Sequence, residues 1–112
     1  MIREYLAGYI PMGIRADALR LEVEENYRGI MRETEAARLL LEKAKQIDRE
    51  REAVRDAINR LSDGLPRRVL VLRYIDGLSW DEVQAQIGYE SSQTYALHRK
   101  GLKELGKILF AK

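Results

Sequence analysis

Apolar residues recur along this chain at helical spacing, and no stretch alternates between apolar and polar residues as a strand does. Residues 14–61 are rich in Ala, Leu, Glu, Arg and Lys, with no proline and a single glycine, Gly29. Their heptad-like stripe changes phase partway. One phase is marked by Leu19, Val23, Tyr27, Ile30, Ala37, Leu41 and Ala44, and the other by Leu40, Ile47, Val54, Ile58 and Leu61. The change predicts a hairpin near residues 29–34 between helices over about 14–31 and 34–61; one long helix is the alternative.

Two stretches of helix-breaking residues divide the rest of the chain. Residues 1–10 predict a short helix that ends at Pro11 and Gly13. The second stretch, Ser62-Asp63-Gly64 with Pro66, separates two predicted domains. These are a helical coiled-coil or oligomerisation region over residues 1–61 and a DNA-binding domain over residues 62–112, which begins with a helix over residues 67–74.

Residues 78–105 predict two helices joined by a tight turn. Ser79 and Glu82 have the spacing of a capping box, in which each side chain satisfies a free amide at the helix start. Gly88 can adopt the left-handed conformation that ends a helix, and Glu90, Ser91 and Ser92 offer caps for the next one. A short capped helix, a glycine turn and a longer basic helix predict a helix-turn-helix, whose second helix can enter a DNA major groove.

Positive charge gathers on that second helix. The whole chain has a net charge of +2, but residues 91–112 hold five basic residues against one acidic residue, Glu104. A basic tail on a soluble helix is the alternative interpretation, but the helix-turn-helix pattern favours double-stranded DNA as the partner. We predict base contacts from the first turns, through Ser92 and Gln93, and phosphate contacts from Arg99 and Lys100. The predicted DNA-binding residues are Ser91, Ser92, Gln93, Tyr95, Ala96, Arg99, Lys100 and Lys103.

The apolar stripe of Leu40, Ile47, Val54, Ile58 and Leu61 has more apolar surface than one small helix-turn-helix can cover. A homodimer through the N-terminal helices is therefore expected, with two-fold symmetry that matches two DNA half-sites. If the protein is a monomer, residues 14–31 fold back and cover the stripe themselves.

Enzymatic and membrane functions find little support in the composition. The chain has no cysteine and one histidine, His98, which has no serine or carboxylate partner at a suitable spacing. No phosphate loop is present either, so we expect no catalysis, no metal and no cofactor. The apolar runs are too short for a membrane span, and a cytoplasmic protein is expected. His98 is expected to be structural or to contact a phosphate, Trp80 to pack on the helix over residues 67–74, and Gly101 to allow close packing on the preceding helix.

Several of these residues resemble the fourth conserved region of bacterial sigma factors, and more closely the sigma-like phage and prophage regulators of the RinA/ArpU kind. The matching positions are Leu65-Pro66, Leu72-Arg73-Tyr74, Gly77-Leu78-Ser79-Trp80 with two acids after it, Ile87-Gly88-Tyr89, and Leu97-His98-Arg99 with Leu102. The resemblance covers about residues 40–108. It implies promoter DNA binding and contact with RNA polymerase, and so sequence-specific control of phage or prophage transcription.

The chain departs from the family pattern at three positions of the second helix. Ala96 stands where Asn or Arg is common, Thr94 where Val or Ile is usual, and Gly101 lies inside the helix. The chain also lacks the part of a sigma factor that melts promoter DNA, which favours an accessory activator. A phage assembly or DNA-packaging protein resembling a small terminase subunit is the alternative, because it too would join a helix-turn-helix to an oligomerising helix.

Overall fold

The computed structural model describes residues 2–110, which form helices and connecting loops without any strand. The prediction of an all-α protein is therefore confirmed. Met1 of the predicted first helix and the last two residues of the predicted C-terminal domain lie outside this range. None of the described helices has the length and apolar character that would let it cross a membrane.

The described chain forms two compact units, which we call the hairpin unit (residues 10–53) and the C-terminal unit (residues 2–9 with 54–110). In chain order the elements are α1 (Ile2–Ala7), α2 (Tyr9–Asn26), the 3₁₀ turn η1 (Gly29–Glu33), α3 (Glu35–Asn59), α4 (Leu65–Leu70), the π-helical turn η2 (Val71–Ile75), α5 (Trp80–Ile87) and α6 (Ser91–Leu109). The predicted domain boundary after residue 61 falls in the loop between α3 and α4. The boundary between the two compact units instead lies within α3, and α1 belongs to the C-terminal unit.

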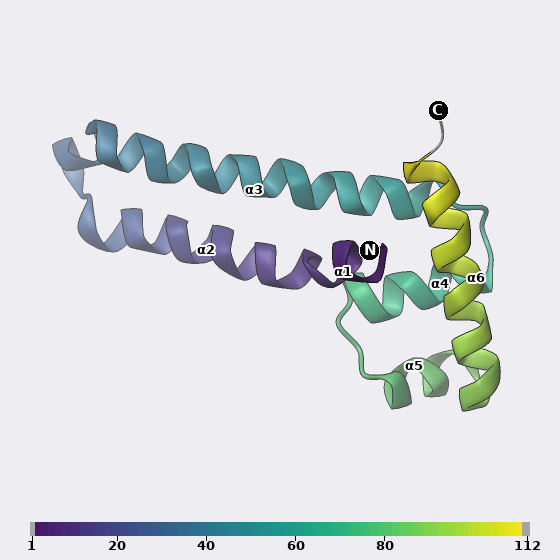
Figure 1. The fold of residues 1–112 in the computed structure, drawn as a ribbon. Helices are drawn as coiled ribbons and strands as arrows, with labels where there is room; N and C mark the ends of the chain where they lie inside the picture. The colour runs from purple at the N-terminus through teal and green to yellow at the C-terminus, as the bar shows by residue number, and fades with distance from the viewer. Residues whose placement is uncertain (1, 111–112) are drawn as a thin grey trace. The chain divides into compact units, whose positions relative to one another are not determined.

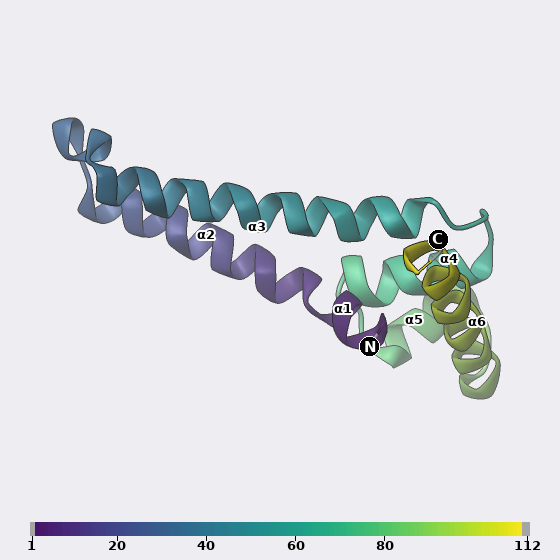
Figure 2. The ribbon, with the colours of Figure 1, turned by 45° about the horizontal axis from the view of Figure 1, so that its top comes forward.

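Two long antiparallel helices, α2 and α3, form the hairpin unit and lie side by side in two views (Figures 1 and 2). Gly29, at the start of η1, has a φ of +58°, a left-handed conformation that L side chains rarely adopt. Thr34 donates a side-chain hydrogen bond of 2.8 Å to the Met31 carbonyl as the chain enters α3. The predicted hairpin is confirmed, although α2 ends at Asn26, five residues earlier than expected.

The prediction that Pro11 and Gly13 end the first helix is wrong, because α2 runs through both residues. Pro11 stands in the first turn of α2, where the backbone amides have no carbonyl partner within the helix and proline removes no hydrogen bond. A Cβ atom at Gly13 would lie 2.8 Å from the guanidinium carbon of Arg51. Gly13 therefore leaves room for the Arg51 side chain of α3, and the chain turns earlier, at Gly8.

The core of the hairpin unit is thin. Ala16, Ala44 and Ile47 form a buried cluster, against which Met12 and Leu19 pack. Farther along α3 and in the following loop, the stripe residues Val54, Ile58 and Leu61 are buried as well. These side chains are covered within a single chain, so the stripe gives no reason for a dimer, and the predicted fold-back of the first long helix accounts for Ile47.

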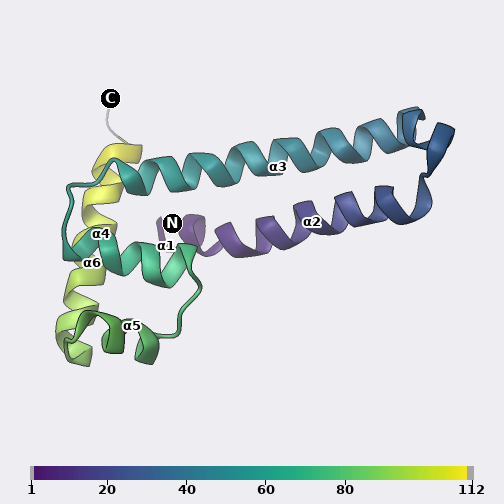
Figure 3. The ribbon, with the colours of Figure 1, turned by 180° about the vertical axis from the view of Figure 1, so that it is seen from behind.

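Larger side chains fill the C-terminal unit, where α4, α5 and α1 all contact α6 (Figure 3). Its fully buried side chains include Leu6, Val54, Ile58, Val69, Leu70, Val83 and Leu105. The helix predicted over residues 67–74 is present, but its second half is the π-helical turn η2, in which the Asp76 amide donates to the Val71 carbonyl at 2.9 Å. Turns of this kind occur often at functional sites, and η2 carries Arg73 and Tyr74.

Candidate nucleic-acid interface

Local capping chemistry fixes the start and the end of α5. The Glu82 amide donates to the Ser79 hydroxyl at 3.2 Å, and the Ser79 amide donates to the Glu82 carboxylate at 3.0 Å. The second bond also lowers the pKa of Glu82, because it stabilises the ionised carboxylate. Gly88 ends the helix with a φ of +80° and a bond from its amide to the Gln84 carbonyl at 2.8 Å. The predicted capping box and glycine turn are both confirmed.

A second set of bonds fixes the start of α6, and it changes the environment predicted for Gln93. The N-cap is Glu90, whose amide donates to the Gln93 side-chain oxygen at 3.3 Å. Thr94 is fully buried and donates its hydroxyl to the Glu90 carbonyl at 2.9 Å. Ser91 and Ser92 follow the cap in the exposed first turn. The Gln93 carboxamide therefore offers its NH₂ group for a partner while its oxygen is engaged by the backbone.

One face of α6 packs into the protein. Its buried residues are Thr94, His98, Gly101 and Leu105, which recur at spacings of four, three and four. A Cβ atom at Gly101 would lie 3.0 Å from the Pro66 carbonyl oxygen and 3.1 Å from Cγ of Leu70. The prediction of close packing at Gly101 is confirmed, but the neighbour is α4 and not the immediately preceding helix α5.

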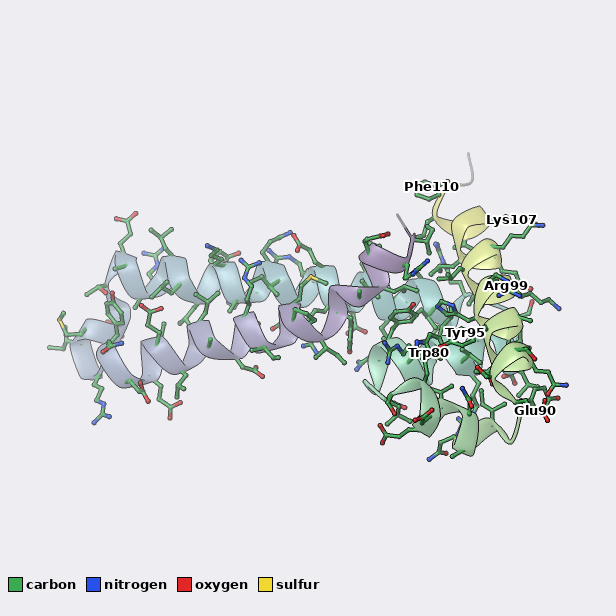
Figure 4. All side chains as sticks on the ribbon, turned by 60° about the horizontal axis from the view of Figure 1, so that its bottom comes forward. Trp80, Glu90, Tyr95, Arg99, Lys107 and Phe110 are labelled. Atoms are coloured by element: carbon green, nitrogen blue, oxygen red, sulfur yellow. The ribbon has the colours of Figure 1, made fainter. Side chains whose placement is uncertain are left out.

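The opposite face of α6 is exposed, and its charged residues are all cations. The exposed residues of the helix are the eight predicted DNA-binding residues together with Lys107. Four of the nine are cations, namely Arg99, Lys100, Lys103 and Lys107, and none is acidic. Lys107, four residues beyond Lys103, was missed as a site residue although the same spacing pointed to it. Figure 4 shows Arg99 and Lys107 along this helix.

Beside this exposed face, four aromatic side chains form a cluster, namely Tyr74 of η2, Trp80 of α5, and Tyr95 and His98 of α6. The ring centroids of Trp80 and Tyr95 are 4.7 Å apart, and those of Trp80 and His98 are 4.8 Å apart in an edge-to-face arrangement (Figure 4). The guanidinium carbon of Arg73 lies 4.9 Å from the Trp80 ring centroid, within the range of a cation–π interaction. Trp80 packs against Val69 and Leu72 as well, as predicted. Tyr95 keeps 36% of its surface exposed at the rim of the cluster.

His98 is a buried neutral group at the centre of this cluster. Its Nε2 atom lies 2.7 Å from the Tyr74 hydroxyl, and the side chain is only 6% exposed. Burial, followed by the positive charges of Arg3, Arg73 and Arg99, lowers the pKa of His98 to about 4. Burial also raises the pKa of Tyr74. His98 therefore stays uncharged near pH 7, and of the two predicted roles its position fits the structural one.

Among residues 2–110 no three His, Asp or Glu side chains are arranged to hold a metal ion. The arrangement around α6 instead offers an exposed basic face beside a cluster of aromatic side chains. Comparisons of the chain with protein-family models, with curated proteins and with solved structures find no match.

Proposed function

We propose that this protein binds double-stranded DNA, with α5 and α6 as a helix-turn-helix and α6 as the helix that enters the major groove. The observation that carries the proposal is the exposed face of α6, which has four cations and no carboxylate. A helix that only needed to be soluble would gain nothing from a single sign of charge, and most solvated helix faces mix both signs. A phosphate backbone, in contrast, requires this segregation.

The helical positions divide the exposed residues into a central line and two flanks. Ser92, Ala96, Arg99 and Lys103 recur at spacings of four, three and four and so share one line along α6. Tyr95 lies on the flank that contacts Trp80, and Gln93 and Lys100 lie on the other flank. Ser92, Ala96 and Gln93 in the first turns are the proposed base contacts, and the cations farther along are the proposed phosphate contacts.

The biological role proposed for this binding is transcription control without catalysis, in the cytoplasm. It is supported by the resemblance of residues 40–108 to sigma region 4-like phage and prophage regulators, which also motivates RNA polymerase as a second partner. The capped start of α5 and the Gly88 turn agree with the conformation that this resemblance implies.

Two single substitutions on α6 test the binding mode. Gln93→Ala should cost about 1–3 kcal/mol on the specific site, with little effect on random DNA, because the amide can bond a base edge. Lys100→Ala should weaken binding to all sequences alike and lower the salt slope of log K by about one. Titrations at several salt concentrations, on a site selected from random sequence and on a scrambled duplex, measure both effects.

A stability measurement must accompany the Gln93 variant, because the same side chain also bonds the Glu90 amide. Equal losses for both variants on specific and random DNA would mean that α6 contacts only the backbone. Unchanged DNA binding in both variants would assign the basic face to a protein partner and overturn the proposal.

A further inference from the structure

A cavity of about 380 Å³ opens beside the exposed face of α6. Four elements of the C-terminal unit line it, namely α1, η2, α5 and α6. Only Tyr95 and Arg99 of its lining also belong to the predicted DNA-binding residues. The cavity is therefore a separate feature that adjoins the candidate interface, and it lies within the 300–1,000 Å³ typical of small-molecule sites.

Three arginine side chains from three elements line this cavity, and the described lining residues include no Asp or Glu, although Glu4 of α1 lies within electrostatic range of Tyr74 in the wall. Arg3 comes from α1, Arg73 from η2 and Arg99 from α6. Arg73 is held in place by a 2.9 Å hydrogen bond to the Leu78 carbonyl and by its position over the Trp80 ring. His98 in the wall lies within electrostatic range of all three cations. A pocket with three positive charges and no lining anion is suited to a phosphate group, for which arginine provides several fixed donors.

The remaining walls are aromatic. Tyr74, Trp80, Tyr95 and His98 line the cavity, and the partly exposed ring of Tyr95 stands at its rim. Aromatic faces of this kind stack nucleobases, which bind to them through their own π-faces. A free phosphate ion would use the arginines alone and leave the exposed part of the Tyr95 ring uncovered. The combined lining matches a ligand that joins a phosphate to a planar ring.

We propose that this cavity binds a phosphate-bearing nucleotide, with the phosphate at Arg3, Arg73 and Arg99 and the base against Tyr95 and Trp80. The nucleotide has two sources, a free nucleoside monophosphate or a nucleotide of DNA bound along α6. The free nucleotide goes beyond the proposed function, whereas the second source rests on it.

Trp80 is the only tryptophan of the chain and lines the cavity, so its fluorescence reports occupancy directly. The protein is titrated with AMP, with GMP, with inorganic phosphate, with adenosine and with a DNA duplex. The test variant is Arg3→Gln, because Arg3 is exposed and lies outside α6. The matched control is Arg60→Gln, which removes the same charge from an exposed position that does not line the cavity. Arg3→Lys tests whether charge alone restores binding.

Saturable quenching by a mononucleotide, with at least tenfold weaker binding in Arg3→Gln and no change in Arg60→Gln, is the expected result. Adenosine, which lacks the phosphate, should bind at least tenfold more weakly than AMP. Quenching by the duplex alone, again dependent on Arg3, assigns the pocket to a DNA nucleotide. Fluorescence that responds to no ligand, or that responds equally in both variants, overturns the proposal.

The variant Lys103→Ala separates this proposal from the proposed function. Lys103 is exposed on α6 and does not line the cavity. If α6 binds DNA, Lys103→Ala weakens duplex binding and leaves the mononucleotide titration unchanged. If mononucleotides bind in an Arg3-dependent way and no variant of α6 affects a duplex, the pocket stands and the DNA proposal fails.

Discussion

In the hairpin unit, basic side chains lie beside acidic ones, whereas the exposed face of α6 in the C-terminal unit has cations and no acid. Residues 10–53 contain nine basic and ten acidic residues, and their ion pairs include Arg20 with Asp17 at 3.1 Å and Arg49 with Glu42 at 3.6 Å. On α6, Arg99, Lys100, Lys103 and Lys107 are exposed together. Charge arrangement therefore separates the two units more clearly than charge content does, and it is the reason why the proposed DNA contacts are assigned to the C-terminal unit.

The buried side chains of the two units also differ in size. The buried cluster of the hairpin unit consists of Ala16, Ala44 and Ile47, and the two alanines bury little apolar surface. Leucines such as Leu70 and Leu105, both fully buried, fill the C-terminal unit. Since stability follows buried apolar area, we expect the C-terminal unit, which also carries the candidate interface, to resist unfolding more than the hairpin unit.

The largest expected effect compares a buried leucine of the C-terminal unit with an exposed leucine of the hairpin unit. Leu105→Ala should lower the free energy of unfolding by about 2–5 kcal/mol, because it removes a fully buried side chain and leaves a cavity. Leu39→Ala in the hairpin unit makes the same chemical change at a side chain that is 63% exposed, and should cost less than about 0.5 kcal/mol. Urea unfolding of both variants measures the two costs, and similar values would remove the contrast.

A second prediction concerns pH and the buried His98. Its pKa is near 4 in the folded protein and near 6.5 when the side chain is free. As the pH falls from about 6.5 to about 4, the unfolded state binds a proton that the folded state excludes, and the free energy of unfolding declines by on the order of 3 kcal/mol. Urea unfolding across this range measures the decline.

The variant His98→Gln provides the control, because it keeps a neutral hydrogen-bonding side chain without a titration. Its stability should vary little between pH 6.5 and about 4.5. Glu4 and Glu82, whose pKa values are lowered from 4.5, contribute only at lower pH. If the wild-type protein and the variant show the same slope, His98 is not the group responsible.

A third prediction compares matched charge reversals in the two units. Lys100→Glu with Lys103→Glu should weaken duplex binding roughly 100-fold and lower the salt slope by about two, because two phosphate contacts are lost. Lys43→Glu with Lys45→Glu changes the net charge equally at exposed positions of α3 and should have a much smaller effect. Equal losses would show that net charge alone governs binding.

The smallest expected effect compares the helix starts of the two units. Ser79→Ala removes the hydroxyl that accepts from the Glu82 amide at 3.2 Å and should cost about 1 kcal/mol. The reciprocal bond stays, because its donor is the backbone amide of residue 79. Thr34→Ala removes a long bond of 3.4 Å from the Ala37 amide and a bond of 2.8 Å to the Met31 carbonyl. The second bond is exposed, so water can replace it, and the substitution should cost about 0.5 kcal/mol. Thermal unfolding distinguishes the two, and an equal or reversed order would contradict the assigned role of the capping box.

Features that depend on neighbours in sequence could be predicted from the sequence. The capping box at Ser79, the glycine turn at Gly88 and the hairpin near Gly29 each follow from the chemistry of a few adjacent residues, and the periodicity of α6 separated its exposed face from its buried face. The assignment of DNA contacts to that face stays a prediction.

Features that depend on distant segments could not be predicted in the same way. Whether Pro11 ends a helix or stands in its first turn depends on where α2 starts. Periodicity does not fix that start to within a few residues. The cavity needed Arg3 of α1 to meet Arg73 and Arg99, which stand about 70 and 95 residues away along the chain. No local pattern in α1 specifies that this helix contacts α6.

The π-helical turn at Val71–Ile75 amounts to one residue more than α-helical geometry accommodates. Deleting a single residue there, such as Val71, would let the segment return to regular α-helical winding. Such a deletion would change the local backbone that places Arg73 and Tyr74, the two residues of this turn that line the cavity, while keeping the helix. In evolutionary terms, a one-residue insertion or deletion in this helix is a switch by which a related chain could gain or lose the cavity without changing its fold.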